Sequence, residues 1–349
     1  MYQPRAQITF SRVDGGTKTF TVFNDFNIYK SYEMLTNRCS ITFPRKYQDE
    51  LEDYFGGSNP IFKRGDKVVI NCGYLPNNRT VFECYIRDIE ANIPVTVFCE
   101  DSMYLLKKHT FNIPSVVPLI TTTKKGKYLK RPKINTTLVK KLQLKELLNI
   151  IIPDDIELDP DIIDIDLGKV IFSRMTPCEI LQKIKDTHGL FSYFVGEKLY
   201  VGFQSNALTT NEATFKMERQ VINSNNLFYK RAEDVPIKVV CISMNDANQK
   251  TTKEAGDEDG EVRTYHYYNV SDEALQQYAN ERLNEERYTG FYGEIVTFLE
   301  PMLSHGDRAK ITSTKLPERD GVYLVKSVSI DVGVRGGGRQ VLELGQKVG

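Results

Sequence analysis

The sequence predicts an α+β protein that is mainly β, built from two related small β-barrels with an α+β module between them and an insertion in the second. Three observations lead to this prediction. Short alternating segments separated by turn residues fill both ends of the chain, whereas amphipathic helical patterns lie in the middle and near residue 280. The chain has 349 residues, which suggests more than one domain, and its 19 Tyr and 18 Phe suit pleated, half-buried surfaces.

The amino-acid composition argues against several classes of protein. Hydrophobic residues make up 40% and charged residues 26%, which argues against a largely disordered chain. The 46 Lys and Arg balance the 46 Asp and Glu, which argues against a nucleic-acid coat built on bulk positive charge. Six cysteines without a C-x-x-C pair predict reduced, buried thiols. No apolar run approaches the roughly 18 residues of a membrane span, and the N-terminus lacks a signal-peptide pattern, so we expect synthesis in the cytoplasm.

Residues 1–105 are predicted to form the first β domain, a small barrel or a sandwich. Alternating segments occur at 17–23 and 39–44, and three further strands are expected at 67–72, 81–86 and 95–99. A short helix is expected at 47–55, before the Gly56-Gly57 pair.

Residues 106–205 are predicted to form the α+β module. Apolar spacing predicts a helix at 138–151. A second helix at 176–187 has a stronger start signal, because Thr176 and Glu179 can form a capping box around Pro177, and Gly189 suits the end of the helix. A β-hairpin is expected at 190–203, with Gly196-Glu197 at its turn.

Two blocks of like charge interrupt this module. Residues 121–145 contain nine Lys or Arg and no acid, and residues 153–166 contain seven acids and no base. The basic block is either a solvated loop or a contact with an acidic partner, and the acidic block could instead neutralise it within the fold. Calcium binding by the acids is disfavoured because an EF-hand spacing is missing. The candidate partner-contact residues are Lys124, Lys125, Lys127, Lys130, Arg131 and Lys133.

Residues 206–349 are predicted to form the second β-barrel, with an inserted hairpin and helix at about 245–290. A strand at 237–243 precedes a polar segment at 245–260, which we expect to be a loop, and residues 261–267 are expected to close the hairpin. The helix at 271–288 has Ser271 as its N-cap and apolar residues every four positions.

The two β regions share a sequence pattern. Gly65-Asp66-Lys67 and Gly306-Asp307-Arg308 each open a strand, and each is followed by an alternating return strand. Gly65 to Ile86 spans 21 positions and Gly306 to Val325 spans 19, so a two-residue difference in the turn aligns them. This repetition predicts a duplication, although two unrelated β-meanders could also look alike. Three copies of a chain with two related barrels would present six similar units, which would match a sixfold partner.

Four segments together resemble the hub family of contractile tail baseplates, which includes the late control protein D of phages and the hub portion of the valine-glycine repeat proteins of type VI secretion. They are residues 62–70, 94–107, 176–202 and 305–333, and their order covers almost the whole chain. The resemblance implies that the barrels of residues 1–105 and 206–349 are tube-like, and that the chain forms a homotrimer whose six barrels continue a hexameric tail tube. It also implies contacts with the tube protein, other baseplate proteins and a separate spike chain, and a location in a virion tail or injection apparatus.

Candidate catalytic groups are few. Adjacent residues of an extended chain face opposite sides, so Glu100 and Asp101 do not suit a glycosidase pair. The glycine-rich segment 335–339 lacks the Lys-Ser/Thr and helix of a phosphate loop, and His188 suits a helix C-terminus. We therefore predict a structural protein with no catalytic, cofactor-binding or metal-binding residues, through whose lumen DNA could pass. The alternative is a cell-wall hydrolase or carbohydrate-binding tail module, and a hub of a tailocin or secretion apparatus is a third possibility.

Overall fold

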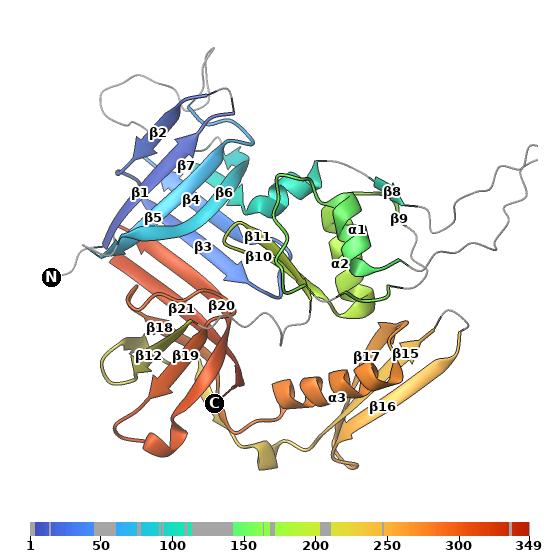
Figure 1. Ribbon diagram of the computed structural model, residues 1–349. Helices are drawn as coiled ribbons and strands as arrows, with labels where there is room; N and C mark the ends of the chain where they lie inside the picture. The colour runs from blue at the N-terminus through green and yellow to red at the C-terminus, as the bar shows by residue number, and fades with distance from the viewer. Residues whose placement is uncertain are drawn as a thin grey trace, which may run out of the picture.

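The protein is described here from a computed structural model (Figure 1). The structure describes residues 4–13, 15–44, 61–74, 78–90, 92, 94–108, 111–113, 142–162, 164–167, 172–202, 211–245, 248–334 and 337–348. The helix expected at 47–55 lies outside the described residues.

The first β unit has seven strands, which all belong to one curled sheet in the order β3-β4-β7-β6-β5-β1-β2. The sheet curls so strongly that Phe20 on β2 packs against Phe43 on β4, with ring centroids 5.1 Å apart. The strands are β1 (Pro4–Ser11), β2 (Thr17–Phe20), β3 (Asp25–Ser31), β4 (Arg38–Phe43), β5 (Lys67–Tyr74), β6 (Arg79–Glu90) and β7 (Val95–Glu100).

The second β unit also has seven strands. β18, β21, β20 and β19 are neighbours in that order, β12 runs parallel to β19, and β13 and β14 both pair with β18. They are β12 (Glu212–Lys216), β13 (Val221–Asn223), β14 (Leu227–Lys230), β18 (Gly290–Thr297), β19 (Arg308–Thr312), β20 (Gly321–Gly333) and β21 (Gly337–Lys347). The cores of the two units form one continuous apolar cluster, because β20 pairs with β3 and joins all 14 strands in a single sheet.

The insertion differs in part from its prediction. β15 (Ile237–Met244), β16 (Lys250–Gly256) and β17 (Glu261–Tyr268) form a separate sheet that packs against α3 (Asp272–Glu286), which begins after the predicted Ser271 cap. The expected loop at 245–260 is wrong, because it contains β16, a polar outer strand without apolar alternation. The expected hairpin closure is also wrong, because β17 pairs with β15 in parallel while β16 takes the antiparallel position.

The α+β module lies beside the β units in Figure 1. The predicted capping box is confirmed: Thr176 accepts from the amide of Glu179, whose carboxylate accepts from the amide of Thr176, and Gly189 ends the helix with φ +68°. The helix predicted at 138–151 begins only at residue 144, because Gln143 is extended and bridges to Asp166. The elements are the 3₁₀ helix η1 (Ser102–Lys107), β8 (Phe111–Ile113), α1 (Leu144–Ile151), β9 (Phe172–Met175), α2 (Pro177–His188), β10 (Phe191–Val195) and β11 (Lys198–Gly202).

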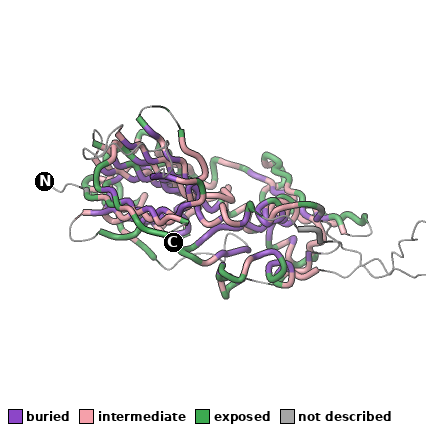
Figure 2. The backbone as a smooth tube through the Cα atoms, turned by 90° about the horizontal axis from the view of Figure 1, so that it is seen from above, coloured by how far each residue is buried: buried purple, intermediate pink, exposed green. Residues whose placement is uncertain are grey.

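The protein is therefore mainly β with a few helices, as the sequence predicted. Figure 2 shows buried backbone running through the β units and on through the module, whose core also takes in Tyr32 and Leu324 from the two β units. Within the described ranges, no helix combines the length and apolar character needed to cross a membrane. The limits of the three predicted domains stay predictions.

Candidate functional site

The predicted partner-contact residues cannot be placed in the structure. Lys124, Lys125, Lys127, Lys130, Arg131 and Lys133 all lie within residues 114–141, outside the described residues, so this prediction stays open. The acidic block is partly described. Its Glu157 forms an ion pair of 2.7 Å with Lys198 on β11, so one acid of the block is neutralised within the module.

The repeated sequence pattern forms a turn in the first β unit that is tied to the return strand by hydrogen bonds. We call this turn with its hydrogen bonds the brace. Gly65 has φ +90°, a value that L-residues rarely adopt, and its amide donates to the carbonyl of Ile86 on the return strand (2.8 Å). The amide of Ile86 in turn donates to the carbonyl of Asp66 (3.0 Å). The fully buried Asp66 carboxylate accepts from the amides of Lys63 (2.9 Å) and Val13 (3.1 Å), which ties the turn to the end of β1.

The second β unit contains the same brace. Gly306 has φ +86° and donates to the carbonyl of Val325 (2.8 Å), whose amide donates to the carbonyl of Asp307 (2.8 Å). The buried Asp307 carboxylate accepts from the amide of Ser304 (2.7 Å) and from the side-chain amide of Asn211 (3.0 Å). The backbone partners match those of the first unit one for one, at the spacing that the sequence predicted.

The return strands also share an irregularity. The pairing of β6 with β7 shifts between Ile86 and Asp88, and the pairing of β20 with β21 shifts between Val325 and Ser327. Because Ile86 and Val325 are equivalent in the braced turns, the two bulges lie at equivalent positions. A β-bulge bends its strand, so each long strand is divided into two halves that can have different neighbours.

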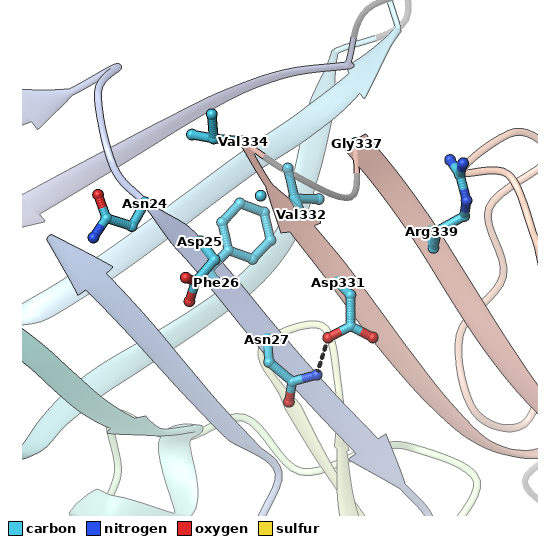
Figure 3. Close-up of a pocket in the computed structure, with 10 residues that line it drawn as sticks. Asn24, Asp25, Phe26, Asn27, Asp331, Val332, Val334, Gly337 and Arg339 are labelled. Atoms are coloured by element: carbon cyan, nitrogen blue, oxygen red, sulfur yellow. Dashed lines mark hydrogen bonds between the residues drawn. The ribbon is translucent and has the colours of Figure 1, made fainter.

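The second half of β20 joins the two units. It pairs with β3 in antiparallel register, with Ser327 opposite Ser31. Asn27 on β3 donates to the hydroxyl of Ser329 (3.0 Å) and to the carboxylate of Asp331, which faces it across the seam in Figure 3. An open groove of about 630 Å³ lies along this seam. The sequence pattern indicated the repeat but gave no signal for this joint, because the strands that form it are some 300 residues apart.

One face of the joined sheet is polar and runs across both units. The core residues of β3, β4, β7, β18, β20 and β21 alternate with side chains on the opposite face. We call this opposite face the continuous face. It also includes the second half of β6, which is the part of this strand after Ile86. Its acidic residues outnumber its basic ones. The acids are Asp25, Asp88, Glu90, Glu100, Glu294, Asp331 and Glu343, and the bases are Arg38, Arg87, Lys326 and Arg339.

The carboxylates considered for catalysis have structural partners. Glu100 is bound by Arg87 (3.1 Å) and by Lys107. Asp101 is the N-cap of η1, and its carboxylate accepts from the amides of Asn37 (3.0 Å) and Met103 (3.1 Å). The two side chains therefore hold chain segments together, and they do not converge on one cleft: Asp101 lines the cavity described next, whereas Glu100 does not.

A cavity of about 430 Å³ lies where the two β units meet the hairpin β10–β11. It is lined by several ionisable groups whose pKa values burial shifts toward the neutral form. Burial raises the pKa of Asp101 to about 7, and it lowers the pKa of Lys30 to about 8 and that of His305 to about 3. Lys30 donates to the carbonyl of Val81. Lys30 and Asp101 come from the side of the first unit and His305 from the second, so polar groups of both units line this cavity.

The six cysteines are all free and buried, as the sequence predicted. Burial raises the pKa of Cys72 and of Cys241 to about 11, which keeps these thiols protonated. Across the described ranges, no three His, Cys, Asp or Glu side chains are grouped closely enough to hold a metal ion.

No protein-family model and no curated protein matches the sequence. Solved structures are similar over nearly the whole chain. A tail protein from Neisseria meningitidis has a TM-score of 0.62 at 13% identity, covering 99% of this chain and 97% of that one. The 43 kDa tail protein of prophage MuSo2 from Shewanella oneidensis has a TM-score of 0.59 at 14% identity, covering 98% of each chain.

A third similar structure comes from a secretion system. It is an Escherichia coli protein described as a component of the type VI secretion system with structural similarity to bacteriophage T4 tail proteins. Its TM-score is 0.55 at 10% identity, covering 94% of this chain and 74% of that one. The resemblance to contractile-tail hub proteins is thus confirmed at the level of the fold: this chain has the fold of phage tail proteins and of their type VI secretion counterpart.

Proposed function

We propose that the chain is the baseplate hub of a phage tail or of a phage-tail-like contractile injection system. Three copies would form a pseudo-sixfold ring that joins the hexameric tail tube to the central spike. The observation that carries this proposal is the repeated β unit, in which the same brace and the same bulge recur at matched positions. The fold shared with tail proteins supports it.

The joined sheet supplies the geometry for such a ring. Two β units already share one sheet within a single chain, so three copies supply six units of similar shape. Heterologous contacts between copies close into a ring when the rotation between units suits the number of copies. The partners of this ring would be the tail tube protein, the spike and other baseplate proteins, and its location would be the tail or injection-apparatus baseplate.

The charge of the continuous face suits a channel. Phosphate contacts with Lys and Arg dominate the affinity of proteins for DNA, so a lumen through which DNA moves benefits from having no excess of positive charge. The acids on this face outnumber the bases, and Arg87 and Lys326 are paired with neighbouring carboxylates. We infer that the continuous face lines the lumen and that assembly, not catalysis, is the role of the chain.

Oligomeric state and symmetry test this proposal. The purified chain should sediment as a trimer of about 120 kDa, three times the 40.0 kDa of one copy. Electron microscopy of the particles should give end-on views with threefold order and six similar lobes. A chain that remains at 40 kDa at every concentration tested, or particles without threefold order, would contradict the proposal.

A further inference from the structure

The seam inside the chain has two unpaired counterparts among the described strands, the second half of β6 and the outer edge of β14. The braces and bulges make Ile86 equivalent to Val325, so Asp88 is equivalent to Ser327 and Glu90 to Ser329. Ser327 and Ser329 pair with β3. Among the described strands, none pairs with the same edge of β6 at Asp88–Glu90, because β5 ends its pairing at Tyr85.

The strand that matches β3 in the second unit is β14. Cys99 pairs with Ile86 and with Cys39, just as Leu344 pairs with Val325 and with Gly293, so β4 and β18 are equivalent.

The next strand along follows from this. Cys39 then pairs with Ile28 on β3, and Gly293 pairs with Leu227 on β14. Tyr29 is therefore equivalent to Phe228, and Ser31 to Lys230. The outer edge of β3 is covered by β20, whereas no described strand covers the outer edge of β14.

The exposed fractions of the equivalent side chains reflect this difference. Tyr29, flanked by β20, is only partly exposed, but Phe228 is 53% exposed and stacks on Tyr292, which is 41% exposed, with ring centroids 5.5 Å apart. Ile222 on the adjoining β13 is 42% exposed. An exposed apolar patch beside an uncovered strand edge is typical of a protein–protein contact, because such an edge left open favours aggregation.

We propose that β14 of one copy pairs with the second half of β6 of a neighbouring copy, repeating between chains the seam that β3 and β20 form within one. This proposal rests on the trimeric ring and names the surfaces that close it. The register of the internal seam, with Ser31 opposite Ser327 and Tyr29 opposite Ser329, transfers directly. This register places Lys230 opposite Asp88 of the neighbouring copy, and these two side chains have opposite charges. It places Phe228 opposite Glu90.

The contact is heterologous, since β14 and β6 belong to different units. Each copy therefore offers one β14 edge and one β6 edge, and three such contacts use every edge in a closed ring. The continuous face then extends without a break from copy to copy, because both Phe228 and Glu90 belong to strands whose neighbours already form that face.

A cysteine pair tests the register. In an antiparallel sheet, opposite residues have Cα atoms about 4.5–5.5 Å apart, within the range of a disulfide. The double variant Asp88→Cys with Lys230→Cys should form covalent dimers and trimers on mild oxidation, visible on a non-reducing gel. The matched control Asp88→Cys with Val262→Cys places the second thiol on the insertion, at a residue 58% exposed, and should stay monomeric on the gel. The native thiols are buried and give little background.

A charged residue introduced into the exposed apolar patch tests how much the patch contributes to the contact between copies. Phe228→Asp should shift the sedimenting species from about 120 kDa toward 40 kDa, while Val262→Asp should leave the mass unchanged. Circular dichroism and thermal melting should show both variants folded, because both side chains are largely exposed. A wild-type trimer that gives no Asp88→Cys/Lys230→Cys cross-link and survives Phe228→Asp would overturn the junction and leave the ring standing. A wild-type chain that never forms a trimer would overturn the ring itself.

Discussion

The braced turns of the two β units have the same backbone hydrogen bonds, but they differ in how far neighbouring side chains cover them. The residue before the glycine is Arg64 in the first unit, where its side chain is 68% exposed and pairs with Asp88. At the equivalent position in the second unit, His305 is only 7% exposed and its ring lies edge-on to that of Tyr193 on β10, with centroids 5.3 Å apart. The α+β module therefore covers the residue before the glycine in the second unit, whereas its counterpart in the first unit remains exposed. A repeated unit can keep its frame while its surface residues adapt to different neighbours.

The strand beside each turn differs as well. β1 runs antiparallel to β5, but β12 runs parallel to β19. The buried aspartate nevertheless ties both strands to the turn, through the amide of Val13 in one unit and the side chain of Asn211 in the other. The brace, not the direction of the neighbouring strand, is the constant part of the repeat.

Removing the braces should give the largest effects. Asp66→Ala leaves two backbone amides without their acceptor at a fully buried site, so we expect a loss of about 2–4 kcal/mol in the free energy of unfolding. Asp307→Ala should cost a similar amount. Chemical denaturation monitored by circular dichroism measures both.

The conservative variants sharpen this test. Asp66→Asn and Asp307→Asn keep one acceptor oxygen, so each should lose less stability than the alanine variant at the same site. A large loss at one aspartate and almost none at the other would contradict the equivalence of the two braces.

Acid should affect the second turn more than the first. Burial lowers the pKa of His305 to about 3, so the folded state favours the neutral ring. The stability from this preference is fully present above the unfolded pKa of about 6.5 and is lost as the pH falls from there toward 3. His305→Gln should therefore flatten the decline in unfolding free energy between pH 6.5 and 4, at up to about 1.4 kcal/mol for each unit of pKa shift.

Arg64→Gln is the matched control at the equivalent, exposed position. Its pH profile of stability should follow the wild type, since no titratable group is removed in this range. If His305→Gln retained the full acid dependence, the contact between His305 and the module would not control stability in acid.

Local signals in the sequence predicted much of this fold. The Thr176 and Glu179 capping box and the two Gly-Asp turns were predictable because each depends on residues close together in the chain. The repeat was visible because the brace needs glycine at a positive φ and a buried carboxylate at one fixed spacing.

Long-range pairing was not predictable in the same way. The seam between β3 and β20 is an edge-to-edge contact whose polar residues, such as Asn27 and Asp331, look like any solvent-facing alternation. β16 escaped prediction for a related reason, since a strand with both faces polar has no hydrophobic period to detect. The uncovered edges of β6 and β14 became visible only when the register was known.

The glycines of the braces should show an intermediate and matched effect. Gly65→Ala and Gly306→Ala force a side chain into φ near +90°, and we expect each to cost about 1–2 kcal/mol. At Gly65 the strain is purely conformational, since the nearest atom to an added Cβ is the Tyr104 hydroxyl at 3.7 Å. Thermal melting measures both variants, and a neutral Gly65→Ala would show that the turn can relax.

The smallest effect should separate the internal seam from the free edge. Asn27→Ala removes the hydrogen bonds to Ser329 and Asp331 across the seam, for which we expect a loss of about 0.5–1 kcal/mol at this partly exposed site. The side-chain amide of the equivalent Asn226, just before β14, donates to Glu294 of its own unit, at 3.5 Å.

Asn226→Ala should therefore be nearly neutral when the unfolding of dilute, dissociated chains is followed in urea. The two asparagines differ because one already faces a paired strand and the other does not. At concentrations where the copies assemble, Asn226 faces the neighbouring β6 in our proposal, so its substitution should begin to destabilise the protein. An Asn226→Ala effect that stays near zero at every concentration would mean that the β14 edge remains unpaired in the assembly.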